Sequence, residues 1–113
     1  MEKFMLIFRG GHTHIATATS QAAKDVIKTW DSWMQGLAEK GKLAGGDALQ
    51  VTGKHVKGVN KVVSEGVYAE GNEMFGGYLI VNANDLDEAV EMAKGCPILD
   101  EAGSVEVRPV QKR

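Results

Sequence analysis

The sequence is poor in the residues that mark specialised classes of protein. It contains one cysteine and two prolines. A single cysteine cannot form an internal disulfide or a cysteine-based zinc site, which predicts a protein of a reducing compartment such as the cytoplasm. The apolar run nearest the N-terminus covers only residues 4–8, whereas a signal-peptide core needs ~7–15 apolar residues and a membrane span ~20. Neither a secretion signal nor a membrane anchor is expected.

An excess of charge of one sign is also missing. Thirteen Lys and Arg stand against fifteen Asp and Glu, which gives a net charge of −2. The longest run of like charges is the closing pair Lys112-Arg113. Nothing in this pattern attracts a phosphate backbone, so no nucleic-acid partner is expected. The 113 residues fit a single domain over residues 1–113, since domains usually hold ~100–200 residues.

Glycine, in contrast, is abundant, with 14 residues that divide the chain into short elements. Runs that are apolar at both parities predict strands buried on both faces, and spacings of three and four predict amphipathic helices. The predicted elements are a strand at 3–9, a helix from Thr19 or Ser20 to Gly41, a hairpin of 48–56 and 60–64 with Gly58 in its turn, a strand at 77–81, a helix from Asp85 that stops before Gly95, and a strand at 104–110.

This order of elements predicts an α+β protein with an antiparallel sheet and two crossover helices. Two helices cover only one face of such a sheet, yet residues 4–8 and 78–81 are apolar on both sides. The second face must therefore be covered by something outside the chain, and the simplest cover is another copy. A homodimer is predicted.

Several motifs resemble the YCII-related, DGPF-type family, over a stretch that runs from about Leu43 to Val110. The most specific of them is the last one. The motifs are Glu65-Gly66-Val67-Tyr68-Ala69-Glu70-Gly71-Asn72-Glu73, Phe75-Gly76-Gly77-Tyr78, Leu86-Asp87-Glu88-Ala89, Gly95-Cys96-Pro97 and Gly103-Ser104-Val105-Glu106-Val107-Arg108-Pro109-Val110.

The resemblance implies a ferredoxin-like βαββαβ fold with a β-hairpin inserted before the third core strand, and pairing of two copies into a dimeric α+β barrel. Relatives in the wider group include dehydrochlorinase-like enzymes with a proposed His–Asp pair, and some DGPF-type members associate with extracytoplasmic-function sigma factors. This sequence has Glu65-Gly66-Val67-Tyr68 where the family has Asp-Gly-Pro-Phe, and Asn72 where it usually has lysine. No histidine lies on the expected first helix, so the His–Asp pair has no counterpart here.

Glu65, Glu70 and Glu73 lie in one short polar segment beside Tyr68. Carboxylates that are brought close together raise one another's pKa, which prepares a carboxylic acid for proton transfer. These three glutamates, with Tyr68 or His14 as a partner, are the candidate catalytic residues. The alternative is that Glu65-Gly66 forms a turn and the other two carboxylates are solvated or paired with Lys and Arg.

Three further features have both a functional and a structural interpretation. Arg108 could bind an anionic ligand through its planar guanidinium or form an ion pair on the face that it shares with Glu106. Trp30 could stack on an aromatic ligand or simply pack in the core. His12 and His14 are two residues apart, as in a two-ligand metal site, but no third ligand is evident, so no metal or cofactor is predicted.

Two functions from different classes follow. The first is a small homodimer that binds a small, acidic or aromatic molecule in a cleft between helices and sheet, with cofactor-free acid–base chemistry of the lyase or isomerase type. The second is a non-catalytic accessory or regulatory module, for example one associated with an extracytoplasmic-function sigma factor. An enclosed pocket that contains a carboxylate of raised pKa favours the first function, and a filled core with an extra apolar patch outside the dimer interface favours the second.

Overall fold

The computed structural model describes residues 1–10, 21–50, 52–67, 69–70 and 73–112. Its elements along the chain are β1 (Glu2–Arg9), α1 (Gln21–Glu39), β2 (Leu43–Ala48), β3 (Lys54–Lys57), β4 (Val62–Glu65), β5 (Ala69–Glu70), β6 (Glu73–Ala83), α2 (Leu86–Ala93), the 3₁₀ helix η2 (Pro97–Glu101) and β7 (Ser104–Pro109).

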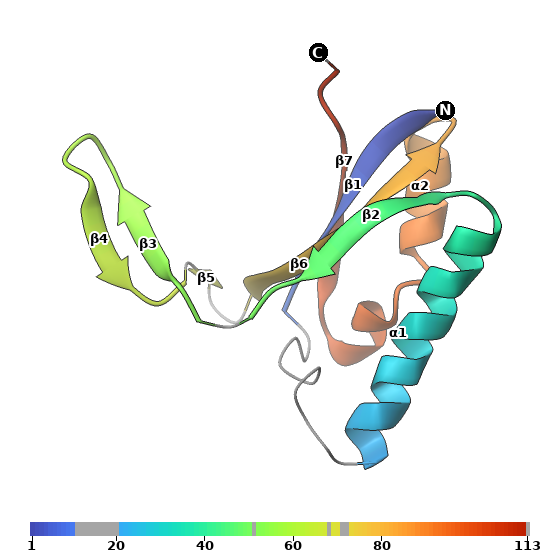
Figure 1. Cartoon of the computed structure of the whole chain (residues 1–113), viewed down its shortest axis with the longest axis horizontal. Helices are drawn as coiled ribbons and strands as arrows, with labels where there is room; N and C mark the ends of the chain where they lie inside the picture. The colour runs from blue at the N-terminus through green and yellow to red at the C-terminus, as the bar shows by residue number, and fades with distance from the viewer. Residues whose placement is uncertain (11–20, 51, 68, 71–72, 113) are drawn as a thin grey trace.

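The main sheet is antiparallel, with strand order β2-β6-β1-β7 and the short β5 paired to β6. The α1 helix connects β1 to β2, and α2 with η2 connects β6 to β7. This is the ferredoxin-like βαββαβ arrangement, with β3, β4 and β5 inserted before the third core strand (Figure 1). The predicted α+β fold class is confirmed. In the described part of the chain, no helix is long and apolar enough to cross a membrane.

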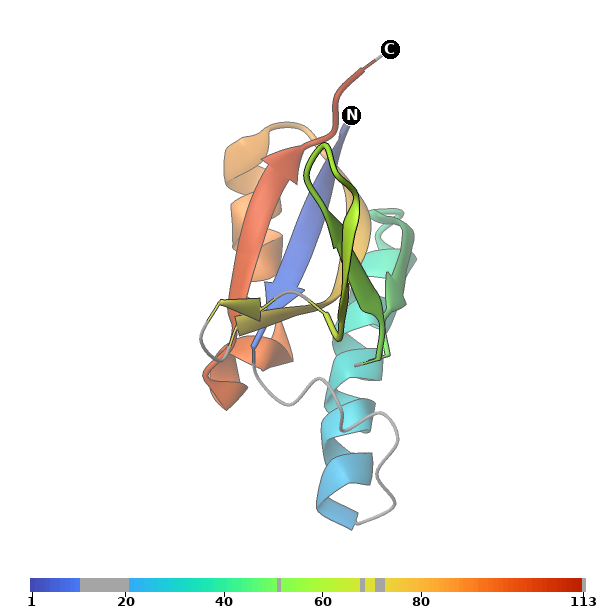
Figure 2. The ribbon, with the colours of Figure 1, turned by 90° about the vertical axis from the view of Figure 1, so that its left-hand side faces the viewer.

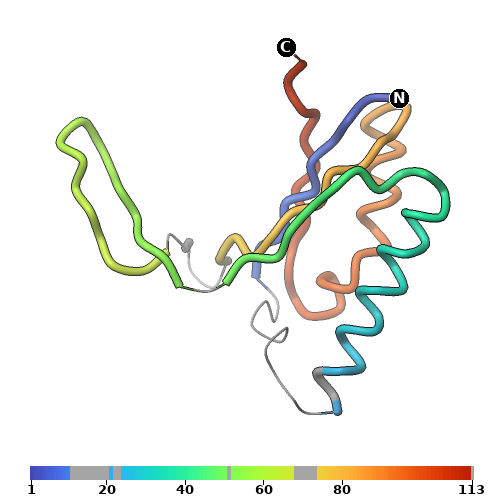
Figure 3. Tube along the Cα trace, viewed as in Figure 1, coloured from blue at the N-terminus to red at the C-terminus, as the bar shows by residue number. Residues whose placement is uncertain are grey.

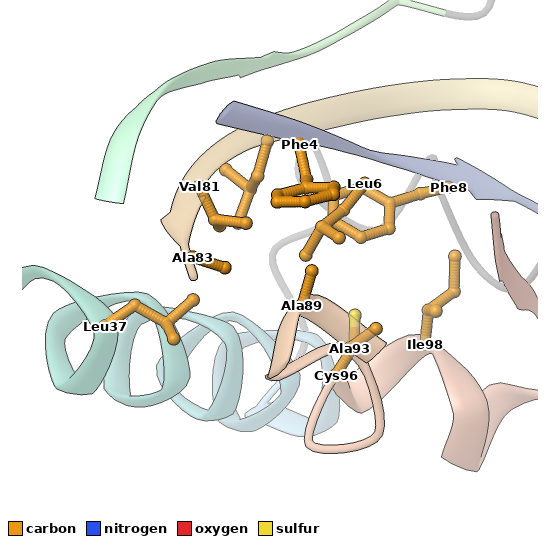
Figure 4. Close-up of a cluster of buried hydrophobic side chains, with 11 residues drawn as sticks. Phe4, Leu6, Phe8, Leu37, Val81, Ala83, Ala89, Ala93, Cys96 and Ile98 are labelled. Carbon is orange, nitrogen blue, oxygen red and sulfur yellow. The ribbon is translucent and has the colours of Figure 1, made fainter. Parts of the chain in front are cut away.

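Alternate residues of each strand point to opposite faces of the sheet. One of these two faces packs on the helices. Figure 2 shows both helices behind the sheet, and Figure 4 shows Phe4, Leu6 and Phe8 of β1 directed toward them. The buried cluster consists of Phe4, Leu6, Phe8, Leu37, Leu79, Val81, Ala83, Ala89, Ala93, Cys96 and Ile98. At ~25 cal/mol per Å² of apolar area removed from water, this cluster is the main source of stability.

The opposite face of the sheet carries apolar side chains at its centre. Met5 pairs with Ile80 and Ile7 with Tyr78 across β1 and β6. Ile7 is only 7% exposed, and the other three side chains are half-buried. The sheet is therefore apolar on both of its faces, as predicted. Because these central side chains are buried or half-buried, the open face exposes less apolar surface than the sequence alone suggests.

The end of α1 and the start of α2 lie at the residues that the sequence indicates. Gly41 follows α1 with φ of 71°, where its N–H bonds to the carbonyl of Ala38, so it is the predicted left-handed C-terminal glycine. Asp85 is the N-cap of α2, and its side chain accepts a hydrogen bond of 2.8 Å from the N–H of Glu88. The residues predicted to begin the first helix, Thr19 and Ser20, lie outside the described part of the chain.

The predicted strand over residues 48–56 is wrong. The second core strand occupies Leu43–Ala48, and β3 begins only at Lys54. The glycine pair in this strand resembles a loop signal in the sequence. In the structure, a Cβ at Gly46 would lie 2.5 Å from the carbonyl oxygen of Tyr78, so glycine is what allows β2 to approach β6 so closely.

The β3–β4 hairpin extends away from the body of the molecule (Figures 1 and 3). Its four residue pairs run from Lys54 opposite Glu65 to Lys57 opposite Val62. Gly58 has φ of 78°, as the predicted turn requires. The hairpin is therefore present, but shorter than predicted and shifted toward the C-terminus.

Candidate ligand-binding cleft

A cleft of about 450 Å³ opens on the helix side of the sheet, between α1, η2 and the ends of β2 and β6. Small-molecule sites usually measure ~300–1,000 Å³, so this volume fits a compact ligand. The lining residues are Phe8, Val26, Ile27, Trp30, Asp31, Met34, Gly46, Asp47, Ala48, Gly76, Gly77, Tyr78, Leu79, Ile98 and Glu101.

Small residues at this end of the sheet help to keep the cleft open. Gly46 pairs with Leu79 and Ala48 with Gly77, and this register places all four on the helix side, the side of the core residue Leu79. A Cβ at Gly77 would lie 2.8 Å from the carbonyl oxygen of Asp47. Neither glycine adds a side chain, and Ala48 adds only a methyl group, so space remains between the sheet and α1.

Aromatic rings form the apolar side of the cleft. The rings of Phe8 and Trp30 meet edge to face, with centroids 5.2 Å apart and an interplanar angle of 84°. Trp33 supports both rings at centroid distances of 6.0 and 6.2 Å, and its indole nitrogen donates to the carbonyl of Met92 at 3.3 Å. Trp33 is thus a structural tryptophan, whereas Trp30 contributes directly to the cleft.

Two carboxylates contribute the charge of the cleft, Asp31 from α1 and Glu101 from η2. Asp47 of β2 also borders the cleft, but it lies opposite Tyr78 in the β2–β6 register, so its side chain points to the open face. There its Oδ2 accepts a hydrogen bond of 3.2 Å from the Tyr78 hydroxyl. The arrangement offers hydrogen-bond acceptors and negative charge beside an apolar, aromatic wall.

Of the predicted catalytic glutamates, Glu65 and Glu70 lie on β4 and β5, which do not form this cleft, and Glu73 is the first residue of β6. Glu65 is on the projecting hairpin, where its side chain is 82% exposed and lies 3.3 Å from Nζ of Lys54. The backbone places Glu70 opposite Glu73 in the β5–β6 pair. Tyr68 and His14 lie outside the described residues, as does His12, so the structure leaves the proposed catalytic set untested.

The two predicted ligand-binding residues are far apart in the fold. Trp30 lines the cleft, so the sequence identified one of its residues. Arg108 lies on the opposite face of the sheet, where its exposed guanidinium Nε is 3.9 Å from Glu106. Glu106 also accepts a hydrogen bond from Arg9 at 2.5 Å. The structure thus shows Arg108 in an ion pair.

Cys96 and the metal-ligand residues define no second site. Cys96 is 2% exposed, and burial raises the pKa of its thiol to about 12, which keeps it protonated and unreactive. Among the described residues, no group of three His, Cys, Asp or Glu side chains could hold a metal ion.

Sequence reasoning missed most of the cleft. Asp31, Asp47 and Glu101 come from three separate elements, and no spacing in the sequence links them. The η2 helix, which carries Glu101, was not expected at all. The only available signal was the glycine pair that contains Gly46, whose strained position marks a close backbone approach.

Fold and cleft together define a ferredoxin-like α+β protein with a small apolar pocket beside the sheet. The family model of the YCII-related domain matches residues 3–112, so the chain belongs to the YCII-related family.

A solved structure with the same fold is the 5-chloro-2-hydroxyhydroquinone dehydrochlorinase TftG from Burkholderia phenoliruptrix AC1100, in complex with 2,5-dihydroxybenzoquinone. The similarity has a TM-score of 0.53 and 18% sequence identity, and it covers 97% of this chain and 95% of that one. No curated protein matches the sequence.

Proposed function

We propose that this protein binds a small, uncharged aromatic molecule with hydroxyl groups in the cleft between α1, η2 and the ends of β2 and β6. The observation that carries the proposal is the combination of the Phe8–Trp30 wall with two carboxylates, Asp31 and Glu101, around one cleft of about 450 Å³. A ring would pack on the aromatic side, and its hydroxyl groups would donate to the carboxylates. Aromatic ligands were one of the two classes that the sequence suggested.

The carboxylates argue against the other class, acidic ligands. A negative charge at about 6 Å from one carboxylate is repelled by roughly 0.7–3 kcal/mol for effective dielectric constants of ~80 to ~20. Asp31 and Glu101 both border the cleft. An anion should therefore bind at least tenfold more weakly than a neutral ring of the same size.

Binding can be tested with hydroquinone as the neutral probe and benzoate as the anionic one, by NMR titration of backbone and indole N–H signals. The hydroxylated six-membered ring is chosen because TftG was solved with such a compound. Eight non-hydrogen atoms at about −0.5 kcal/mol each give a Kd of about 1 mM. We expect saturable shifts at the Trp30 indole with hydroquinone and much weaker ones with benzoate; equal affinities, or no shifts at all, would contradict the proposal.

Matched variants connect this binding to the cleft. Trp30→Leu removes the aromatic contact and should raise the hydroquinone Kd about 2- to 10-fold, which corresponds to the free energy contributed by one aromatic pair. Asp31→Asn should weaken the preference for hydroquinone over benzoate. Asp25→Asn, on the same helix but outside the cleft lining, is the control and should change neither.

We further propose cofactor-free proton transfer as the chemistry of this cleft, with Asp31 or Glu101 as the base. Both groups line the cleft from different elements. A ring hydroxyl could lose its proton to one carboxylate while a ring carbon takes a proton from the other group in its carboxylic acid form, and reversal of both transfers after exchange with solvent restores the starting states. Ring-hydrogen exchange of phloroglucinol in D₂O, followed by NMR, tests this without a known substrate. We expect acceleration that Glu101→Gln reduces and Asp100→Asn does not. Exchange at the rate of protein-free buffer would refute the catalytic part alone.

We also propose that the protein is a cytoplasmic homodimer in which the open sheet faces of two copies meet as a dimeric α+β barrel. Support for the dimer comes from Met5, Ile7, Tyr78 and Ile80 at the centre of that face. The free, buried Cys96 suits a reducing compartment. Sedimentation equilibrium should give about twice the 12.1 kDa chain mass, and cell fractionation should place the protein in the cytoplasm.

A further inference from the structure

The largest concentration of exposed apolar side chains lies on the β3–β4 hairpin rather than on the open sheet face. Val56, Val62 and Val63 are 59–61% exposed, and Val59 at the turn is 95% exposed. In the sheet, by comparison, Ile7 is only 7% exposed. Monomers rarely leave such contiguous apolar surface without a partner.

The hairpin has two different faces. Directly opposite residues of an antiparallel pair share a face, so Val56 and Val63 lie together with the Lys54–Glu65 ion pair. Val62 lies on the other face, opposite Lys57. The first face therefore presents a valine pair, while the second presents one valine beside a lysine.

A two-stranded hairpin of this size is only marginally stable by itself. Each strand has four residues. Additional packing on the Val56–Val63 face would hold it in place, and the described part of the chain leaves these two valines 61% and 59% exposed.

We infer that the β3–β4 hairpin is an arm that packs its Val56–Val63 face against a second copy of this chain. The inference rests on the homodimer proposed above. Figures 1 and 2 show the hairpin on the same side of the sheet as the open face, with both helices on the other side. A copy docked on the open face would therefore come within reach of the arm.

Charge and area both favour a second copy as the occupant. The arm, residues 54–65, has three lysines and one glutamate, hence +2, and since the whole chain is −2 the remainder carries −4. A basic arm thus complements the acidic body of a copy. A stable dimer buries ~800 Å² per partner, and the exposed valines of the arm would add apolar area to that of the open face. The solvent-accessible surface of the chain is 7801 Å², against roughly 6,000 Å² for a compact monomer of this mass, so the chain exposes more surface than a compact monomer does.

The valines provide a matched test, because Val62 and Val63 are equally exposed, at 59%, and point to opposite faces. The dimer dissociation constant is measured by sedimentation equilibrium for the wild type, Val63→Gln and Val62→Gln. We expect Val63→Gln to raise it at least tenfold, since a symmetric dimer loses the contact twice, and Val62→Gln to change it less than threefold. Rising salt should also raise the wild-type constant.

The possible outcomes distinguish a failure of the arm proposal from a failure of the dimer proposal. A wild-type dimer that Val63→Gln leaves unchanged, or that Val62→Gln weakens as much, would overturn the arm and leave the sheet-face dimer in place. A wild-type monomer at 100 µM would overturn both and favour a heterologous partner for the hairpin. Amide hydrogen exchange at residues 56 and 63 is the second measurement: protection that rises with wild-type concentration supports the arm, and protection independent of concentration overturns it.

Discussion

The substitution Gly46→Ala should destabilise the protein strongly, although it adds a single methyl group. Gly46 has φ of 149°, a backbone conformation that is essentially restricted to glycine and costs other residues ~1–3 kcal/mol. The new Cβ would also lie 2.5 Å from both the Tyr78 carbonyl oxygen and the Leu79 side chain. Overpacking of this kind costs a further ~1–3 kcal/mol.

Together these effects predict a loss of roughly 2–6 kcal/mol in the free energy of unfolding, out of a total of ~5–15 kcal/mol for a typical domain. At about 4 °C per kcal/mol, the melting temperature should fall by roughly 10–20 °C. Urea unfolding followed by tryptophan fluorescence measures the free energy, and calorimetry measures the melting temperature.

The neighbouring glycine is the control. A Cβ at Gly45 meets no atom within 4 Å, and its φ is not positive. Gly45→Ala should therefore stay within about 0.5 kcal/mol of the wild type. If Gly46→Ala is as mild as Gly45→Ala, β2 does not pack on β6 as described, and the end of the sheet that borders the cleft is misplaced.

Three further predictions concern the body of the fold. The pKa of Glu88 is lowered, first by its hydrogen bond from Lys42, so its stabilising effect is present above its unfolded pKa near 4.5 and is lost as the pH falls through the lowered value. Urea unfolding should show Glu88→Gln less stable than the control Glu91→Gln at pH 7, with the two variants converging once the pH is below that lowered value. The thiol of Cys96, with its pKa raised to about 12, should react with iodoacetamide in native protein no faster than the protein opens, and reaction at the rate of a free thiol would contradict its burial. Ile98→Ala should cost ~2–5 kcal/mol in urea unfolding because Ile98 is 1% exposed, and a cost under about 1 kcal/mol would mean that η2 is not part of the core.

The sequence was sufficient for the elements whose signals are local. The period of α1 and the glycine after it, the Asp85 cap of α2 and the doubly apolar strand at 4–8 each have a structural counterpart. These features depend on neighbours within a few residues, so the local sequence is enough to predict them. The motifs that resemble the YCII-related family extended this to the strand order, which local patterns alone do not determine.

The sequence failed where tertiary contacts override local preference. Leu43–Ala48 contains two glycines, and the sequence predicted a strand only from Ala48 onward, yet Leu43–Ala48 is a core strand because β6 lies so close to Gly46. No element was predicted over 97–101, but burial of Pro97 and Ile98 makes this segment a 3₁₀ helix in the core. Long-range packing determines the structure of both segments, and the hydrophobic periodicity of the sequence does not indicate such packing.

The candidate site shows the same division. Trp30 was considered because aromatic residues are conspicuous in any sequence. The carboxylates that accompany it come from α1 and η2, and only the folded chain brings Asp31 and Glu101 to one cleft. The sequence directed attention instead to Glu65, which the fold places on the hairpin beside Lys54.

The most direct test of the central claim is to locate a bound neutral ring by NMR. Intermolecular nuclear Overhauser effects are recorded between hydroquinone and the labelled protein at several millimolar probe. The account predicts contacts from the ring hydrogens to Trp30, Met34 and Ile98, which line the cleft from α1 and η2. Contacts confined to the valines of the β3–β4 hairpin, or to the open face around Ile80, would contradict it.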